Sequence, residues 1–159
     1  MNYKLLPITS ADESFLLQVY ASSRAEELSF ATWTEDVKEV FVKSQHINQN
    51  RHYFNIYPNG SFDIVEFDGE RAGRFYKVEL KDEIRIIDAT LLPEFRNRGI
   101  GTRLITDVLT VARRKSKPVR IYLENYNSSR RLFSRLGFHL ISEDGVYGLW
   151  EKKVGTERL

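Results

Sequence analysis

The sequence predicts an α+β domain, of mixed α/β order, built on a central and mostly antiparallel sheet. Three observations support this fold class: helical periodicity in the first 60 residues, a hairpin signal within 62–80, and a strand–helix–strand crossover within 83–124. Hairpins give antiparallel strand pairs, whereas a crossover of this length joins parallel strands with a right-handed connection. The 159 residues are enough for one hydrophobic core, so we expect one domain over 1–159.

The N-terminal part predicts a strand followed by two helices. The strand is "YKLLPIT", and Ser10 is the expected cap of the first helix, because Glu13 three residues later completes a capping box. Thr34 is the expected cap of the second helix. Apolar residues recur at helical spacing in both segments: Phe15, Leu16, Val19 and Tyr20 in the first, and Val37, Val40, Phe41 and Ile47 in the second.

The next segment predicts three strands. "FDIVEF" and "RFYKVEL" lie on either side of Asp68-Gly69, a dipeptide typical of tight hairpin turns. "EIRIIDATLL" follows the short turn "KDE" and ends before Pro93.

The C-terminal part predicts two helices and two strands. A helix that presents Leu104, Val108 and Ala112 on one face ends at Pro118, and basic residues in its last turn complement the helix dipole. "VRIYLE" is rich in β-branched residues and predicts a strand. "NSSRRLFSRLGF" predicts a short helix capped by Asn127 or Ser128, and "VYGLWEKK" lies near the last strand.

Composition excludes several classes of site. There is no cysteine, so disulfides, thiolate metal sites and a cysteine nucleophile are ruled out. The three histidines show no metal-ligand spacing, and we expect no metal. A net charge of +2 is too small to indicate nucleic acid by itself. The chain has neither a signal-peptide layout nor an apolar run of membrane-spanning length, so we expect a cytoplasmic protein without a membrane partner.

The stretch "RNRGIGTRL", Arg96–Leu104, predicts a site for an anion. The first amides of a helix have no acceptor within the helix, and the helix dipole favours negative charge there. Gly99 and Gly101 lack a Cβ, so a phosphate oxygen can approach the backbone. Arg96, Arg98 and Arg103 add positive charge. The alternatives are a tight turn without ligand for the glycines and a solvated surface for the arginines.

Two common phosphate loops do not fit this stretch. A P-loop requires Gly-Lys-Ser/Thr, and here Thr102 follows Gly101 directly. The dinucleotide fingerprint requires a third glycine at the position that Leu104 occupies.

Two segments resemble the GNAT superfamily of acyl-CoA-dependent N-acyltransferases. "IDATLLPEFRNRGIGTRLI" is similar to the family's strand, turn, Arg-x-x-Gly-x-Gly loop and helix, and "VRIYLENYNSSRRLFSRLGF" to its later strand, Asn-containing loop and helix. The resemblance covers roughly 84–138. It implies a twisted mixed sheet with helices on both faces and a splayed strand pair that holds acyl-CoA. It also implies an acceptor-side part at 1–61, a CoA-binding core at 62–138 and a C-terminal strand at 139–159.

The resemblance further implies which residues bind the cofactor. The loop amides would hold the CoA pyrophosphate, the main chain at Leu91 and Ala89 would bind the pantetheine arm, and Leu92 would open the loop. Asn127 matches an asparagine beside the pantetheine, although it also suits a helix cap. The implied cofactor-binding residues are Leu91, Leu92, Arg96, Asn97, Arg98, Gly99, Ile100, Gly101, Thr102 and Asn127.

The catalytic groups depart from the family pattern. Phe133 occupies the position where many members have a tyrosine that protonates the leaving thiolate, and phenylalanine cannot donate a proton. Arg85 corresponds to a position where members have a glutamate. Asp88 is the carboxylate within the same strand, so it is the candidate general base, with Glu83 behind it. A purely structural role for Asp88 is the alternative.

The resemblance implies an N-acetyltransferase that moves the acetyl group of acetyl-CoA to a primary amine by direct attack. The second hypothesis, which Phe133 and Arg85 favour, is a non-catalytic acyl-CoA-binding or regulatory module. A third is an RNA-binding protein that uses the arginines within 113–135, with affinity that falls steeply with salt. The expected partners are a small-molecule or peptide amine and no nucleic acid, and a homodimer is possible; the identity of the amine is open.

Overall fold

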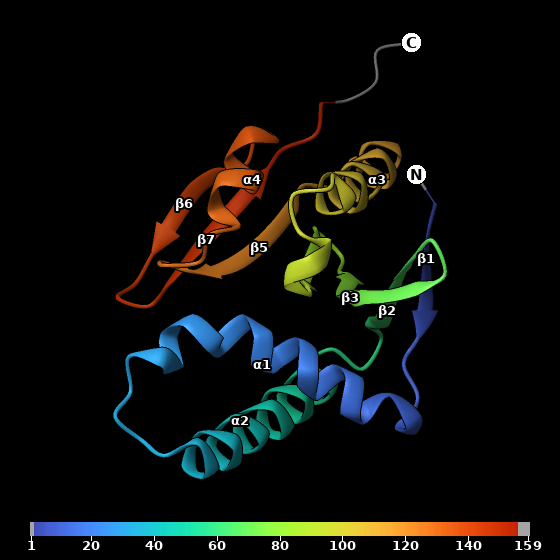
Figure 1. Ribbon diagram of the computed structural model, residues 1–159. Helices are drawn as coiled ribbons and strands as arrows, with labels where there is room; N and C mark the ends of the chain where they lie inside the picture. Colours follow the sequence, from blue (N-terminus) through green and yellow to red (C-terminus); the bar gives the residue numbers. More distant parts are fainter. Residues whose placement is uncertain (1, 156–159) are drawn as a thin grey trace. The chain divides into compact units, whose positions relative to one another are not determined.

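The computed structural model describes residues 2–155. Within them, seven strands follow one another in the hydrogen-bonded order β1-β2-β3-β4-β5-β7-β6, accompanied by four α-helices (Figure 1). The pairs β1–β2, β5–β7 and β6–β7 are antiparallel, whereas β4–β5 is parallel. The predicted mixed, mostly antiparallel sheet and its parallel crossover are therefore confirmed.

Two compact units make up the described chain, and each is considered by itself. The first runs to Tyr76 and takes in Ala89–Arg96, and the second comprises Lys77–Asp88 and the residues from Asn97 onward. The elements of the first unit are β1 (Tyr3–Pro7), α1 (Glu13–Ser29), α2 (Glu35–Ile56), β2 (Ser61–Phe67) and most of β3 (Glu70–Glu79). Those of the second include most of β4 (Ile84–Leu91), then α3 (Ile100–Lys115), β5 (Val119–Glu124), α4 (Arg130–Arg135), β6 (His139–Glu143) and β7 (Tyr147–Lys152).

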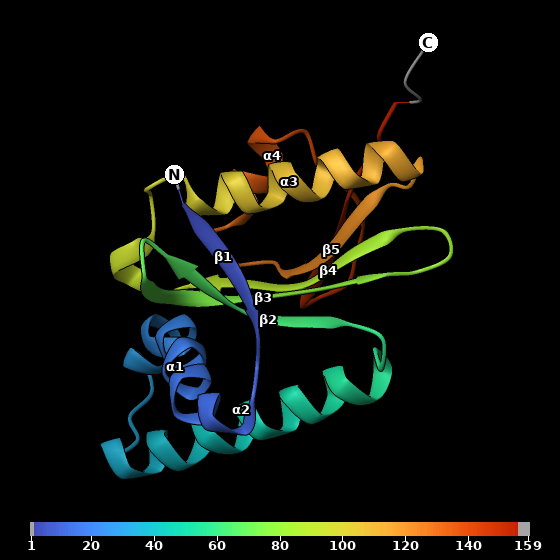
Figure 2. The same ribbon diagram turned by 90° about the vertical axis from the view of Figure 1, so that its right-hand side faces the viewer.

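In the first unit, β1 lies beside β2, with Leu5 opposite Val65 (Figure 2). Asp68 and Gly69 form the turn after β2 with φ of 49° and 83°. Positive φ at both central residues is what a tight two-residue hairpin turn needs. The hairpin signal at this dipeptide is thus confirmed.

The capping prediction for the first helix was wrong, because the N-cap of α1 is Asp12 and not Ser10. The capping box belongs to a 3-10 turn at Ser10–Asp12 that leads into α1: Thr9 caps this turn, and its N–H donates to Asp12 Oδ2 at 2.8 Å. Two Ser/Thr-x-x-acid patterns overlap here, Thr9 with Asp12 and Ser10 with Glu13. The first pattern, whose acidic side chain is the shorter one, forms the capping box. Thr34 caps α2 as predicted, because its Oγ1 accepts the N–H of Val37 at 3.3 Å.

Helix α3 buries the apolar face that the sequence predicted. Leu104, Val108 and Ala112 lie in the core of the second unit, together with Ile100, Ile105 and Leu109. The helix ends where Ser116 adopts a left-handed conformation (φ 53°). Lys115 and Lys117 both bind the Glu79 carboxylate, the latter with Nζ 2.7 Å from Oε2.

Helix α2 does not bury the face that the sequence indicated. Its buried residues are Val42, His46 and Asn50, whereas Val37 and Val40 are exposed. The prediction was thus right in part: Phe41 packs against the buried cluster of Tyr20, Leu28 and Val42, whereas Ile47 is exposed like the two valines.

Strand β6 was not predicted. Its residues are all exposed, so no alternation of buried and exposed positions marks it as a strand. The pairing of β6 with β7 shifts register between Leu140 and Ser142, which is a β-bulge or a similar irregularity.

Candidate functional site

The loop before α3 has the backbone of an anion site. Asn97 and Gly99 both have left-handed conformations, with φ of 59° and 83°, and Gly99 is the N-cap of α3. The helical ladder starts with the Arg103 N–H, which donates to Gly99 O at 3.1 Å. The amides of Ile100, Gly101 and Thr102 therefore belong to the first turn, where N–H groups lack acceptors within the helix. Such amides, together with the helix dipole, favour a bound anion.

Gly101 has a packing role within this turn. A Cβ on Gly101 would lie 3.2 Å from Leu132 Cδ2 of the segment that forms α4. The glycine thus permits close contact between the start of α3 and α4, in addition to leaving the backbone uncovered.

The three arginines around the loop have different surroundings. Arg103 is exposed, and its Nε donates to Asp107 Oδ2 at 3.3 Å, one turn along α3. Arg96 Nε donates to Leu91 O at 3.0 Å, so it fixes the end of β4 within the first unit. Arg98 is exposed. The positive charge of the loop is partly used by internal contacts.

Leu92 has internal partners for both main-chain groups. Its N–H donates to Ala72 O at 2.8 Å, and its carbonyl accepts the Phe95 N–H at 3.0 Å. The leucine side chain is buried. The contribution of Leu92 is thus to set the direction in which the chain leaves β4.

The parallel ladder between β4 and β5 is short. It pairs Ile84–Ile86 with Val119–Ile121, although β5 continues to Glu124. Within the same unit, β4 continues through Asp88, which is half-buried. Asp88 thus lies just beyond the point where the two strands stop pairing.

Asn127 shapes the turn before α4. Its Oδ1 accepts the N–H of Ser129 at 2.9 Å and the Ser129 hydroxyl at 2.7 Å, while its Nδ2 donates to Glu124 Oε2 at 3.1 Å. The N-cap itself is Ser129, so the expected cap at Asn127 or Ser128 was wrong in position. Asn127 nevertheless makes the side-chain-to-backbone bonds typical of such turns.

Phe133 is fully enclosed in the second unit. It is 1% exposed and packs edge-on against Phe138, with ring centroids 5.0 Å apart. Its side chain is part of the core.

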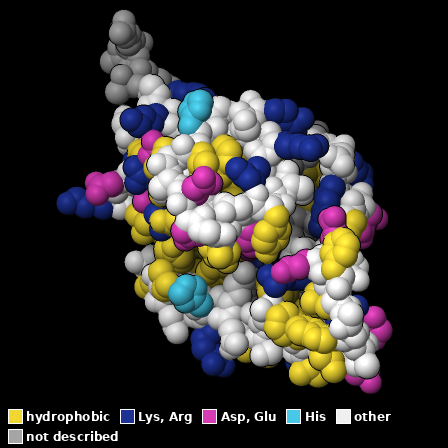
Figure 3. Space-filling model, turned by 90° about the vertical axis from the view of Figure 1, so that its left-hand side faces the viewer, with side chains coloured by type: hydrophobic (Ala, Val, Ile, Leu, Met, Phe, Trp, Pro, Cys, Tyr) yellow, Lys and Arg dark blue, Asp and Glu magenta, His cyan; other side chains and the backbone are white. Residues whose placement is uncertain are grey.

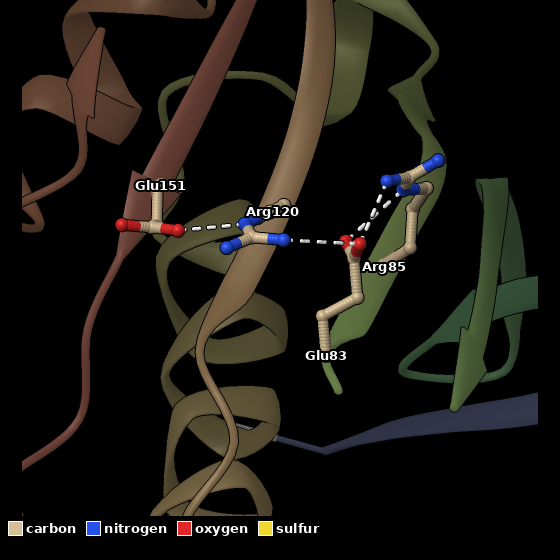
Figure 4. Close-up of polar contacts among 4 residues, drawn as sticks. All are labelled: Glu83, Arg85, Arg120 and Glu151. Carbon is tan, nitrogen blue, oxygen red and sulfur yellow. Dashed lines mark hydrogen bonds and ion pairs between the residues drawn. The ribbon is translucent and has the colours of Figure 1, made fainter. Parts of the chain in front are cut away.

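Glu83, the second candidate for the general base, belongs to a chain of ion pairs (Figure 4). Its Oε1 accepts from Arg85 Nη2 at 2.8 Å and from Arg120 Nη1 at 3.3 Å. Arg120 Nε in turn donates to Glu151 Oε2 at 2.6 Å, and this bond is the main cause that raises the pKa of Arg120. The Glu83 carboxylate thus already accepts hydrogen bonds from two guanidiniums.

The first unit contains a buried polar cluster that the sequence did not indicate. His46 is 1% exposed, and its Nε2 lies 3.2 Å from Glu13 Oε2 and 3.3 Å from Asn50 Nδ2. Burial lowers the pKa of His46, although Glu13 acts in the opposite direction. His46 and Asn50 are four residues apart on α2, but polar residues at that spacing usually face solvent. Nothing in the sequence shows that this pair of polar residues is buried rather than exposed to solvent.

The family can be established from a comparison with known protein families. A model described as the acetyltransferase (GNAT) family matches residues 23–138. The chain belongs to this family. Its chemistry is therefore, in general terms, acyl transfer. The match includes the loop before α3 and the turn at Asn127.

Solved structures show the same GNAT fold at low sequence identity. The PaiA N-acetyltransferase of Thermoplasma acidophilum, solved with coenzyme A, is 18% identical with a TM-score of 0.71, covering 96% of this chain and 99% of its own. An acetyltransferase of Thermus thermophilus is 13% identical with a TM-score of 0.69, covering 97% and 98%. A GNAT-family acetyltransferase of Staphylococcus aureus is 13% identical with a TM-score of 0.65, covering 97% and 100%. No protein of curated function matches the sequence.

Two absences hold for residues 2–155. No group of three or more histidine, cysteine or acidic side chains in this range is arranged to hold a metal ion. No helix of the described chain has the length and apolar character required to cross a bilayer.

Proposed function

We propose that this GNAT chain is an N-acetyltransferase that moves the acetyl group of acetyl-CoA to a primary amine by direct nucleophilic attack. The observation that carries the proposal is the left-handed turn at Asn97 and Gly99, which leads into the uncapped first turn of α3. This turn lies inside the segment that the family model matches.

The residues of the loop fit a diphosphate. The loop supplies both backbone amides and cations, and a diphosphate needs both. Its residues are Arg96, Asn97, Arg98, Gly99, Ile100, Gly101 and Thr102. The Leu91 main chain and Asn127 are the proposed partners of the pantetheine arm, which carries amide groups. The Thermoplasma relative binds coenzyme A, which supports the choice of ligand. Acetyl-CoA supplies an acyl group activated as a thioester.

Asp88 is the proposed general base. An amine attacks only when it is neutral, so a protonated amine must first lose a proton. Asp88 lies where β4 no longer pairs with β5, and Glu83 is held by arginines. With Phe133 unable to donate a proton, the thiolate leaves unassisted; a thiol pKa of about 8.5 makes it a competent leaving group near neutrality.

Replacement of Asp88 tests its role. We expect Asp88→Asn to lower kcat by about 10²- to 10⁴-fold at neutral pH, because the amide cannot accept the proton. The exposed Asp82 of the preceding turn offers a control, and Asp82→Asn should leave kcat unchanged. A normal kcat and pH profile for Asp88→Asn would show that Asp88 is structural.

The decisive experiment for the function combines calorimetry with thiol release. Acetyl-CoA should bind the purified protein, and addition of a panel of amines should release free thiol. A non-catalytic acyl-CoA-binding module is the second candidate, because buried Phe133 replaces the family's tyrosine; such a module binds acetyl-CoA and releases no thiol with any amine.

Gly99→Glu tests the loop itself. A negative side chain on the loop should weaken acetyl-CoA binding at least about 100-fold, by repelling the diphosphate and straining a residue at φ 83°. Gly69→Glu is the matched control, since Gly69 also has φ 83° but lies in the β2–β3 turn. If both variants bind acetyl-CoA like the parent protein, the diphosphate does not occupy this loop.

A further inference from the structure

The outward face of α2 carries a stripe with coiled-coil spacing. Its members recur at alternating intervals of three and four residues, and we refer to them as the α2 stripe: Val37, Val40, Ser44, Ile47, Arg51 and Phe54. Four of them are apolar, and Val40 is 71% exposed. Alternating intervals of three and four are typical of a helix that packs along another helix. These four side chains are 39% to 71% exposed, although Phe54 also packs edge-on against Phe62 of β2, with ring centroids 4.8 Å apart.

Two hollows follow one another along the stripe. The first, of about 490 Å³, is lined by Asp36, Val37, Val40, Phe41 and Ser44. The second, of about 290 Å³, is lined by Glu13, Ile47, Asn50, Arg51, Phe54 and Asn55. Figure 3 shows hydrophobic side chains gathered at the lower right of this face, over the α1–α2 turn and the start of α2. The first hollow lies between side chains of α2 alone, whereas the second also borders Glu13 of α1. Hollows along a helix surface are what the side chains of a facing helix fill.

Charge is distributed unevenly along α2. The first half contains Glu35, Asp36 and Glu39 against Lys38 and Lys43, whereas the second half contains Arg51 and no acidic residue. Lys38 is already paired with Glu35 at 3.5 Å. A partner helix should therefore be positive beside the start of α2 and tolerate Arg51 near its end.

We propose that the α2 stripe is an antiparallel contact between two copies of this chain. A second α2, turned by a two-fold axis, meets each of these requirements. When Ser44 faces Ile47 of the second copy, the same register brings Val40 against Arg51 and Val37 against Phe54. Arg51 of each copy then comes about one helical turn from Asp36 of the other.

The alternatives are less compatible with the charges. A parallel pair would place the two acidic first halves together, and like charges repel. An anionic membrane surface would be repelled by the same acidic residues. The antiparallel pair also opposes the two helix dipoles favourably. This contact does not depend on the reaction proposed above.

Sedimentation equilibrium of the full chain tests the contact. The parent protein should be a dimer at micromolar protein concentrations. Val40→Lys should weaken the dimer at least about 10-fold, because the ammonium would face Arg51 of the second copy. Val111→Lys alters an exposed valine on α3 and should leave the dimer intact. Melting curves of both variants establish that each one is folded.

A charge exchange tests the register. Asp36→Arg should weaken the dimer, and the double variant Asp36→Arg with Arg51→Asp should restore it, since the pair is regenerated with reversed signs. The proposal is overturned if the parent protein is still a monomer at concentrations about 100-fold above the micromolar range. It is also overturned if Val40→Lys leaves the dimer unchanged, or if the double variant does not restore the dimer.

Discussion

Helices α2 and α3 both carry apolar residues at helical spacing, but they place them in opposite environments. In α3 the stripe of Leu104, Val108 and Ala112 is buried. In α2 the buried positions are Val42, His46 and Asn50, and the apolar stripe is exposed. Periodicity thus shows that a helix has an apolar face without showing what that face contacts. The exposed apolar face of α2 is the basis of the contact between copies proposed above.

Truncation of one side chain in each helix should have very different effects. Leu104→Ala should lower the free energy of unfolding by about 2–5 kcal/mol, because Leu104 is 3% exposed and its loss leaves a cavity. Val40→Ala should change the unfolding free energy of the monomer by less than about 0.5 kcal/mol, since Val40 is exposed. Urea denaturation at concentrations where the chain is monomeric measures both. Similar losses for the two variants would contradict the assignment of the two faces.

The buried polar face of α2 should make stability depend on pH. The pKa of His46 is lowered from its ordinary value of 6.5, mainly by burial. His46 therefore binds a proton more readily in the unfolded chain than in the folded one. Its effect on the free energy of unfolding is absent above about pH 6.5, and the free energy of unfolding falls as the pH drops below this value. His46→Gln should reduce the difference between urea midpoints at pH 7.5 and 5.5, whereas His52→Gln, at an exposed position, should not. An unchanged difference in His46→Gln would show that another group causes it.

The smallest effect concerns the contacts at the end of α3. Hydrogen bonds from Lys115 and Lys117 lower the pKa of Glu79 to about 2 from its ordinary value of 4.5. The contribution of this group to stability is present above about pH 4.5 and is lost as the pH falls towards 2. Lys115→Gln should raise the Glu79 pKa in an NMR titration, whereas Arg114→Gln, in the same turn, should not. An unshifted midpoint would mean that the ion pair does not persist in solution.

The parts of the fold that could be predicted are those where local chemistry decides. Asp68-Gly69 fixed the hairpin because few dipeptides adopt two left-handed residues. Thr34 was identified because its side chain bonds an amide three residues away. The cap at Thr9 was missed because two equally spaced patterns overlap. β6 was missed because a strand whose residues are all exposed shows no alternation.

The candidate site follows a similar rule. The glycine loop was visible because Gly99 must adopt positive φ, which few other residues do readily. The contact of Gly101 with Leu132 was not visible, because it joins residues that are distant in sequence. The pairing of Glu83 with Arg120 was missed for the same reason. The roles of Asp88 and of the cofactor-binding residues stay predictions.

The irregular pairing of β6 bears on how copies of this chain meet at high concentration. β6 is an outer strand of the sheet, and its register shifts between Leu140 and Ser142. An interrupted outer strand is a poor template for another chain, because an incoming strand cannot form an unbroken row of hydrogen bonds with it. This edge is thereby protected against open-ended growth into fibrils, and crowding should favour assemblies that close on themselves.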